Sequence, residues 1–327
     1  MTKKNELISI ILTLYNKASY IEETIFSIYK QTYTNRELII VDDCSTDWSL
    51  EIAKSFCEKL WITNKCKFIQ NEKNLRVAKA FERWLKEAKW DWISMCDSDD
   101  ILMKNKLEEN LSYCTKNNID FCHGDLVIIN ENNNIINDSR MKYTKTKYKN
   151  KTYQKLIPSW NAVWTSIFFS KKVWDSLKKD WFPDFPNFLY QDRWSIIYSS
   201  LKWFKIWYID KSLVYYRRCE SCITWGKHKK TRKDNRTVLN NYKKNMIWEN
   251  TLINYILSHN LCINNTQINR CKKHIEINKL LLAFLDSQKY FMPYKILKLL
   301  ITLWDPKYYY RVFIIQTRKI LTLFSKS

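Results

Sequence analysis

The chain has 327 residues, of which 46% are hydrophobic and 27% are charged, a balance typical of globular proteins that argues against a disordered chain. Its formal net charge of +22 favours contact with phosphate, in nucleic acids, in sugar nucleotides or in anionic lipids. Because Lys and Asn occur along the whole chain, an AT-rich genome also explains part of this excess.

The first 118 residues alternate between expected strands and helices. Apolar runs predict strands at 7–13, 37–41, 67–70 and 92–96, and apolar residues at helical spacing predict helices near 21–28, 52–60, 77–85 and 107–114. This alternation implies parallel strands with right-handed crossovers. Ser19 and Glu22 match a capping box at the start of the first helix.

Three carboxylates follow the fourth of these strands, at Asp97, Asp99 and Asp100. Ligands bind at the carboxyl ends of strands in an open α/β sheet. Carboxylates this close repel one another unless a cation or a proton lies among them, so they indicate a hard divalent metal such as Mg²⁺ or Mn²⁺. A solvated acidic turn that caps the helix near Lys104 is the alternative.

Residues 119–226 predict a mixed sheet. Strand stretches are expected at 120–122 and 126–130, forming a hairpin with 135–136, followed by a mobile loop at 138–160 and strands at 163–169, 207–209 and 213–216. A helix is expected to begin around Asp192. Beyond residue 226 charged helical segments follow, and the last, 308–324, is a basic amphipathic helix suited either to an anionic membrane surface or to packing on the main domain.

Cysteine usage and the N-terminus bear on the compartment. The 10 Cys are scattered, which predicts reduced thiols and not a disulfide framework. The single Cys-x-x-Cys, completed by Cys271 and His274, is a weak alternative zinc site. Residues 1–7 lack a signal-peptide pattern, and no apolar run approaches the ~18 residues that span a bilayer, so we expect a cytoplasmic protein.

Four motifs occur in an order that resembles the family 2 glycosyltransferases, inverting enzymes with the GT-A fold. They are Thr13-Leu14-Tyr15-Asn16, the 41–47 turn, the 97–100 cluster and Gln191-Asp192. The resemblance covers about residues 7–226. It implies a GT-A domain at 1–226, with a nucleotide-binding half (1–118) and an acceptor half (119–226), followed by a helical, basic C-terminal extension at 227–327.

The resemblance also implies roles for single residues on the nucleotide side. Thr13 and Tyr15 match positions beside the base, and Asp43 matches the carboxylate that accepts a hydrogen bond from the base ring. Asp97 and Asp99 match the pair that holds Mn²⁺ or Mg²⁺ against the sugar-nucleotide diphosphate.

Five further positions are carried over in the same way. Asp100 matches a residue beside the donor sugar, and Asp192 matches the catalytic base. Asn74 and Arg76 fall in a segment that borders the donor pocket, and Arg217 falls in a loop that closes over the donor phosphates. Without the resemblance, the simpler explanation of Asp192 is a structural one, an acidic residue that the dipole of a helix N-terminus favours.

These residue types fit glycosyl transfer chemically. A metal bridging the diphosphate oxygens stabilises the charge that develops on the leaving group. One positioned carboxylate accepts the proton of the attacking hydroxyl, and a direct displacement inverts the anomeric centre.

The implied partners are a nucleotide-sugar donor, expected to be a UDP-sugar, and a cell-surface glycan or lipid-linked acceptor at the inner face of an anionic membrane, with no specific nucleic acid. One alternative is a basic nucleic-acid-binding protein, which would bind DNA or RNA in a salt-sensitive way but leaves the acidic cluster unexplained. Another is a non-catalytic GT-A-like scaffold, whose activity would not depend on Asp192.

Glycine is scarce in this chain. There are 2 Gly and 15 Trp, against an average glycine usage of about 7%. Trp48, Trp90, Trp203 and Trp207 occupy turns or element ends where glycine is expected, since glycine adopts the left-handed conformation freely. We hypothesise that many of these tryptophans are glycines in the native protein, because some bacteria read the UGA codon as glycine.

Overall fold

The computed structural model describes residues 5–74, 90–138, 163–179 and 204–218, together with scattered single positions between 195 and 279. The chain forms two compact units, Met1–Gly226 and Lys227–Ser327. The expected helix at 77–85, the loop centred on residue 150 and the amphipathic segment 308–324 lie outside the described residues. The described positions beyond residue 227 are helical.

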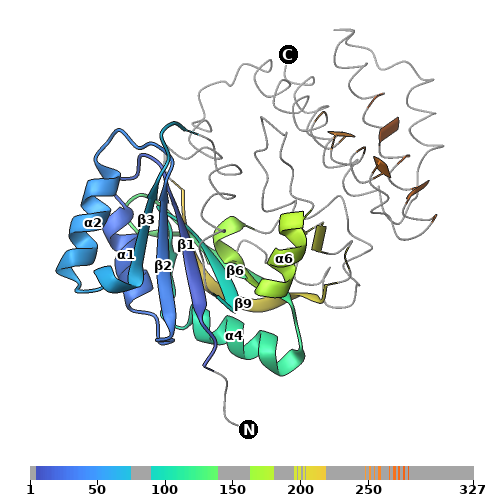
Figure 1. Cartoon of the computed structure of the whole chain (residues 1–327), viewed down its shortest axis with the longest axis horizontal. Coiled ribbons are helices and arrows are strands. Elements are labelled where there is room, and N and C mark those ends of the chain that lie inside the picture. The colour runs from blue at the N-terminus through green and yellow to red at the C-terminus, as the bar shows by residue number, and fades with distance from the viewer. Residues whose placement is uncertain are drawn as a thin grey trace. The chain divides into compact units, whose positions relative to one another are not determined.

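Nine strands among the described residues form one sheet (Figure 1). They are β1 (Ile8–Leu14), β2 (Arg36–Asp42), β3 (Cys66–Gln70), β4 (Trp92–Asp97), β5 (Ile101–Leu102), β6 (Phe121–Ile129), β7 (Ile135–Asn137), β8 (Ile167–Ser170) and β9 (Ile206–Arg217). Their order is β3-β2-β1-β4-β8-β6-β9-β5, and β7 pairs with β6.

Strand direction divides the sheet. β1 pairs in parallel with β2 and β4, β2 with β3, and β6 with β9, whereas β8 runs antiparallel to β4 and β6. The hairpin of β6 and β7 is also antiparallel. This confirms the predicted α/β class with a mixed, mostly parallel sheet, and it brings the carboxyl ends of β1, β2 and β4 to one edge.

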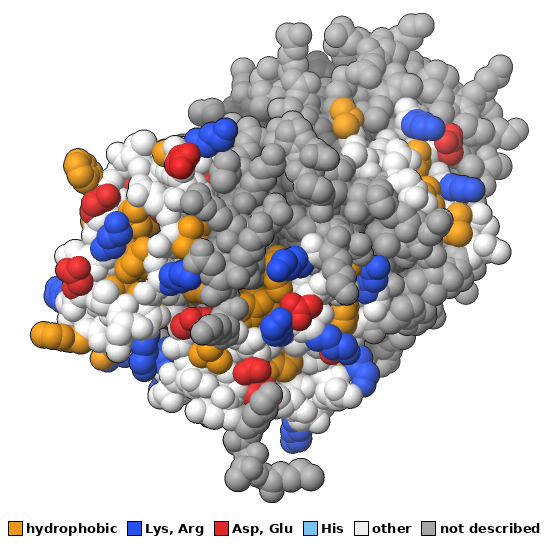
Figure 2. All heavy atoms as spheres, in the orientation of Figure 1, with side chains coloured by type: hydrophobic (Ala, Val, Ile, Leu, Met, Phe, Trp, Pro, Cys, Tyr) orange, Lys and Arg blue, Asp and Glu red, His pale blue; other side chains and the backbone are white. Residues whose placement is uncertain are grey.

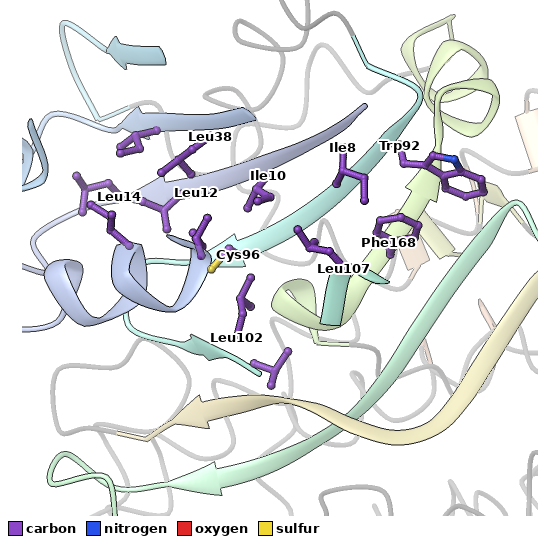
Figure 3. Close-up of a cluster of buried hydrophobic side chains, with 14 of the residues drawn as sticks. Ile8, Ile10, Leu12, Leu14, Leu38, Trp92, Cys96, Leu102, Leu107 and Phe168 are labelled. Carbon is purple, nitrogen blue, oxygen red and sulfur yellow. The ribbon is translucent and has the colours of Figure 1, made fainter. Parts of the chain in front are cut away.

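Helices flank the sheet and bury its apolar residues (Figure 3). The described helices are α1 (Ile21–Tyr29), α2 (Ser49–Lys59), α4 (Lys106–Asn117) and α6 (Lys171–Lys179). Ile8, Ile10 and Leu12 alternate along β1 and share one core with α1, α2 and α4. Ile11 and Met95, at the intervening positions, are fully buried too. Burial on both faces explains why these strands read as continuous apolar runs.

Two strands are longer than predicted. The expected breaks in β6 and β9 fall at polar residues, but both strands continue through them. The β6–β9 pairing shifts register on both sides of Asp125, a bulge that absorbs the interruption while the strands stay paired. β5 and α6 were not predicted, because β5 has only two residues and α6 directly follows a strand.

The expected capping box of α1 is wrong. The residue that precedes the first helical turn is Tyr20, and no side chain caps the helix. The N–H groups of Tyr20 and Ile21 both donate to the carbonyl of Lys17 at 3.0 Å. This preceding turn starts the helix one residue later than a capping box at Ser19 requires.

Six described non-glycine residues have a positive φ, and two of them are tryptophans. Trp48 has a φ of 66° and Trp61 a φ of 56°, beside Asn16, Cys44, Asn118 and Asn133. Trp90 is not in this region and is buried, and Trp207 lies within extended β9. The expected backbone strain is therefore wrong for Trp90 and Trp207, and Trp203 lies outside the described residues.

Candidate active site

The parallel strands bring predicted site residues from three parts of the chain to one edge. Thr13 pairs with Val41 of β2 and with Asp97 of β4. The Thr13 hydroxyl donates a hydrogen bond to Asp97 Oδ1 at 3.1 Å. Tyr15, just past the end of β1, is 43% exposed. The edge therefore combines an aromatic ring that a ligand can reach with carboxylates.

Asp43 is oriented from two sides at the end of β2. Its backbone N–H donates to the carbonyl of Leu14 at 2.9 Å, and the side-chain amide of Asn71 donates to its Oδ1 at 3.0 Å. Asn71 is buried, and its own Oδ1 has no hydrogen-bond partner among the described residues. We did not predict a role for Asn71. The sequence feature that could have indicated one is its place as a polar residue directly after a strand that ends at this edge.

Two loops at this edge are bound together by side-chain to backbone hydrogen bonds. The N–H groups of Asn16, Lys17 and Ala18 donate to Ser45, Ser49 and Asp47, at 3.1, 2.7 and 3.0 Å. Burial raises the pKa of Asp47, but the hydrogen bonds that it accepts from Ser49 and Ala18 outweigh burial and lower the pKa overall. The loop after β1 is therefore anchored on the loop before α2.

The acidic turn, residues 97–100, carries three carboxylates with different environments. Asp97 accepts the Thr13 hydrogen bond described above. Asp99 forms an ion pair with Lys17, Oδ2 to Nζ, at 2.7 Å, and both side chains are largely buried. Lys17 was not predicted; it follows the Thr13–Asn16 motif directly and places a cation next to the acidic turn.

Asp100 is the most enclosed of the three carboxylates. It is fully buried, Oδ1 accepts the backbone N–H of Arg217 at 2.9 Å, and Oδ2 has no hydrogen-bond partner among the described residues. Burial, and then the negative charges of Asp99 and Asp97, raise the pKa of Asp100 well above its usual range. Burial and the two neighbouring carboxylates therefore both disfavour the charged form of Asp100.

The chemistry of the acidic turn fits a divalent cation. Carboxylate oxygens are the ligands that Mg²⁺ and Mn²⁺ prefer, and Asp100 Oδ2 is an unsatisfied buried oxygen. Within the described parts of the chain, no three His, Cys, Asp or Glu side chains converge into a closed metal-binding group.

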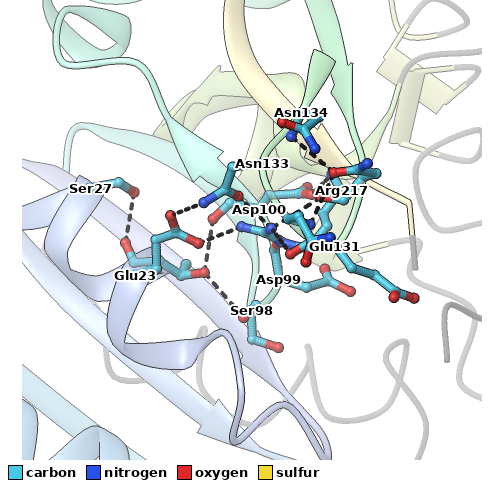
Figure 4. Close-up of polar contacts among 12 residues, drawn as sticks. Glu23, Ser27, Ser98, Asp99, Asp100, Glu131, Asn133, Asn134 and Arg217 are labelled. Carbon is cyan, nitrogen blue, oxygen red and sulfur yellow. Dashed lines mark hydrogen bonds and ion pairs between the residues drawn. The ribbon is translucent and has the colours of Figure 1, made fainter. Parts of the chain in front are cut away.

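Arg217, at the end of β9, lies against the acidic turn (Figure 4). The residue is 2% exposed. Its Nε donates to the carbonyl oxygen of Asp99 at 2.8 Å, and its Nη2 lies 2.5 Å from Glu23 Oε2. A backbone carbonyl oxygen and a carboxylate of the protein therefore hold the guanidinium of Arg217.

Of the remaining predicted positions, the structure describes only Asn74. Asn74 is exposed, beyond the end of β3. Arg76 and Asp192 lie outside the described residues, as do Cys219, Cys222, Cys271 and His274. Their roles stay predictions.

The face of the molecule in Figure 2 is mixed in charge where it is described. On the coloured part of the face in Figure 2, Lys and Arg alternate with Asp, Glu and hydrophobic side chains instead of forming one basic patch. None of the helices in the described part of the chain is long and apolar enough to cross a membrane.

Comparisons with known proteins agree with this architecture. The sequence profile described as Glycosyl transferase family 2 matches residues 9–177. A stretch of 126 residues, 38% of the chain, is 40% identical to the Escherichia coli UDP-Glc:alpha-D-GlcNAc-diphosphoundecaprenol beta-1,3-glucosyltransferase WfgD and covers 48% of that protein. The chain spans about half the length of the curated relatives it matches.

Two solved structures share the fold. Staphylococcus aureus TarS 1–349 in complex with UDP-GlcNAc has a TM-score of 0.57 at 19% identity, covering 83% of this chain and 72% of that one. The Pyrobaculum calidifontis mannosyltransferase PcManGT, in complex with GDP-Man and Mn²⁺, has a TM-score of 0.55 at 13% identity, covering 99% and 87%. These likenesses confirm the predicted GT-A fold.

Proposed function

The chain belongs to glycosyl transferase family 2, and we propose that it transfers a sugar from a UDP-sugar to a glycan or lipid-linked acceptor with inversion at the anomeric carbon. The observation that carries this proposal is the meeting of Thr13, Asp43 and Asp97 at the carboxyl edge of three parallel strands. Ligands bind at that edge in open α/β sheets.

The nucleotide would be held at the ends of β1 and β2. The exposed ring of Tyr15 offers a stacking surface for a base. Asp43 presents a carboxylate that the Asn71 amide orients, and a carboxylate accepts the imide N–H of uracil but repels the acceptor N3 of cytosine. A uridine nucleotide therefore suits this end of the site.

The diphosphate would lie against the acidic turn. Asp97 and Asp99 would hold Mn²⁺ or Mg²⁺, which supplies positive charge to the leaving diphosphate when bound. Lys17, which pairs with Asp99 here, would exchange that partner for a phosphate oxygen of the donor. Thr13 keeps Asp97 in place through their hydrogen bond. Mn²⁺ in the PcManGT complex supports the choice of ion.

The transfer itself needs a base and a donor sugar in line with it. Asp192 would accept the proton of the acceptor hydroxyl as the new glycosidic bond forms, and Asp100 would border the donor sugar. Attack from the side opposite the diphosphate inverts the configuration of the anomeric carbon.

The acceptor assignment draws on the diphosphoundecaprenol-linked substrate in the name of WfgD. Such an acceptor would be met at the cytoplasmic face of the cell membrane, where the basic segment 308–324 would contact anionic lipid. The nucleic-acid-binding alternative predicts a different result. The protein would then bind arbitrary DNA or RNA in a salt-sensitive way that does not depend on Mn²⁺, and it would not respond to nucleotides.

Calorimetric titration of UDP, CDP and GDP into the protein, with Mn²⁺ and with EDTA, tests this function. We expect UDP to bind more tightly than CDP or GDP, and Mn²⁺ to strengthen UDP binding by about tenfold or more, since the ion neutralises charge between carboxylates and diphosphate. Equal affinities for the three nucleotides, unaffected by Mn²⁺, would contradict the proposal.

A further inference from the structure

Arg217 joins three segments that are far apart in the sequence (Figure 4). Its Nε donates to the carbonyl of Asp99 at 2.8 Å, and its backbone N–H donates to Asp100 Oδ1 at 2.9 Å. Its Nη1 donates to Asn133 Oδ1, in the turn between β6 and β7, at 2.6 Å. Its Nη2 pairs with Glu23 Oε2 of α1 at 2.5 Å. The acidic turn, the β6–β7 turn and α1 therefore share one buried cation.

The backbone of the acidic turn is held independently of its metal-binding carboxylates. Thr24 of α1 donates to the carbonyl of Asp100 at 2.8 Å, and the N–H of Asp100 donates to the carbonyl of Asp97 at 3.2 Å. Arg217 donates a hydrogen bond to the carbonyl of Asp99, which lies between Asp97 and Asp100 in the turn. Because these hydrogen bonds use backbone groups, they fix the backbone positions of Asp97 and Asp99 and leave the two carboxylates available.

Glu23 has two roles in this arrangement. Its Oε2 pairs with Arg217, and its Oε1 accepts the side-chain amide of Asn133 at 2.8 Å. Asn133 has a φ of 64°, so the β6–β7 turn is itself in a conformation that few residue types adopt. The ring of Tyr20 lies 4.8 Å from the guanidinium carbon, which encloses the cation further.

We propose that Arg217 is a positioning residue that fixes the acidic turn for metal and donor binding, and that Glu23 in turn fixes Arg217. This inference rests on the proposed function. It replaces the contact with donor phosphates expected from the sequence, because all three guanidinium nitrogens donate to protein acceptors in a buried site. Removing one partner of such a buried network leaves the others unsatisfied.

The test compares Arg217→Lys, Arg217→Ala and Glu23→Ala with Glu22→Ala, a matched control on the same turn of α1 whose side chain is exposed. Affinities are measured for UDP with Mn²⁺, for UDP with EDTA and for uridine. We expect the Arg217 and Glu23 variants to lose about tenfold or more in Mn²⁺-dependent UDP affinity, the loss typical of one broken charge-assisted hydrogen bond. Uridine affinity and the control should stay within about twofold, the scatter of remote surface changes.

The double variant Glu23→Ala/Arg217→Ala should lose no more than Arg217→Ala alone, because Glu23 acts through Arg217. If the Arg217 variants fail to fold, Glu23→Ala and Asn133→Ala carry the test. Equal behaviour of Glu23→Ala and Glu22→Ala would overturn the inference. So would an Arg217→Lys loss that is as large in EDTA as in Mn²⁺, which would indicate a direct phosphate contact.

Failure of the proposed function gives a different result. Wild-type protein would then bind neither uridine nor UDP, and the inference about Arg217 would fall with it. If the wild type binds UDP and the Arg217 and Glu23 variants bind it equally well, only the proposed role of Arg217 is overturned.

A separate observation concerns the two tryptophans at the ends of α2. Trp48 precedes the helix with φ 66° and ψ 12°, and its side chain is 72% exposed. Trp61 follows the helix with φ 56°, and its side chain is 92% exposed. Neither indole is buried against the protein, so packing does not offset the strain of a left-handed backbone at a bulky residue.

The hydrogen bonds around Trp61 identify the position. The N–H of Trp61 donates to the carbonyl of Glu58 at 2.9 Å, and the N–H of Ile62 donates to the carbonyl of Cys57 at 3.1 Å. This pair of bonds forms the Schellman motif, whose left-handed residue is usually glycine. Three of the other four described positive-φ residues are Asn, which tolerates this conformation.

We infer that residues 48 and 61 are glycine in the protein as its own cells make it, through a UGA codon read as glycine. Tryptic peptides 37–54 and 60–65 of protein purified from the source organism each hold one of these positions, and mass spectrometry distinguishes the two residue types. Trp92, buried and stacked 5.1 Å from Phe168, is the control and should be tryptophan. Tryptophan at either position 48 or position 61 would overturn the inference.

Discussion

Thr13 and Asp97 lie opposite each other at the carboxyl ends of neighbouring parallel strands, and the threonine hydroxyl donates to the aspartate carboxylate at 3.1 Å. The residue expected beside the nucleotide base thus contacts a residue expected to bind the metal. In this family 2 glycosyltransferase, neighbouring strands of the sheet therefore join the two halves of the proposed nucleotide site.

Replacing either member of the metal pair should abolish metal dependence. We expect Asp97→Asn and Asp99→Asn to lower transfer by about 10²-fold or more, a loss typical of removing electrostatic stabilisation of a transition state, with a loss of Mn²⁺-stimulated UDP binding. Asp175→Asn, an exposed acid on α6, is the matched control. Activity of Asp97→Asn and Asp99→Asn equal to that of this control would exclude the proposed metal site.

The base should be separable from donor binding. Asp192→Asn is expected to lower kcat by about 10²- to 10⁴-fold, the usual contribution of a general base, while UDP affinity stays unchanged. Asp184→Asn, an acid in the same segment, serves as the comparison. An Asp192→Asn protein that retains its full rate would favour the non-catalytic scaffold or another base.

Asn71 should matter for base recognition through Asp43. Asn71→Ala removes the amide that donates to Asp43 and is expected to weaken UDP binding by about tenfold, as one lost buried hydrogen bond does. Glu72→Gln, the exposed neighbour, should have no effect. Titration calorimetry measures the affinity of both variants for UDP and for uridine. If Asn71→Ala weakened the binding of UDP but not of uridine, a role at the base would be contradicted.

Acid should destabilise the fold through His123. Burial lowers the pKa of this β6 imidazole to about 4, whereas the unfolded chain protonates near the ordinary value of about 6.5. Between these two values the unfolded state binds more protons, so stability should fall as the pH is lowered from about 6.5 to about 4, by roughly 3 kcal/mol in all. Urea unfolding at several pH values measures this change.

The matched protein for that measurement is His123→Gln, which keeps a polar side chain but cannot take up the proton. Its unfolding free energy should fall less steeply over the same pH window. Parallel curves for the two proteins would show that the acid sensitivity comes from other groups.

The sequence predicted the parallel half of the fold well, for a physical reason. Strands buried on both faces, such as β1 and β4, appear as unbroken apolar runs, and the polar residues at their ends mark the ligand edge. Asp97 could be found in this way, whereas Thr13 and Asp43 were identified through the family resemblance. The missed strand β5 depends on a contact made far along the chain, since its two residues pair with β9.

The same limit applies within the site. Lys17 and Asn71 have ordinary local sequences, and their roles come from Asp99 and Asp43, which only the folded sheet brings near. The family resemblance predicted Arg217 as part of a loop that closes over the donor phosphates. Its burial depends on Glu23 and Asn133, which are remote in sequence.

The most direct measurement of the central claim is turnover of a panel of sugar nucleotides by the wild-type chain and by the Asp97→Asn/Asp99→Asn double variant, with Mn²⁺ and with EDTA. The proposed function predicts that at least one UDP-sugar is hydrolysed or transferred by the wild type in Mn²⁺, and by neither the double variant nor the wild type in EDTA. A folded wild-type protein that turns over and binds no sugar nucleotide would contradict it.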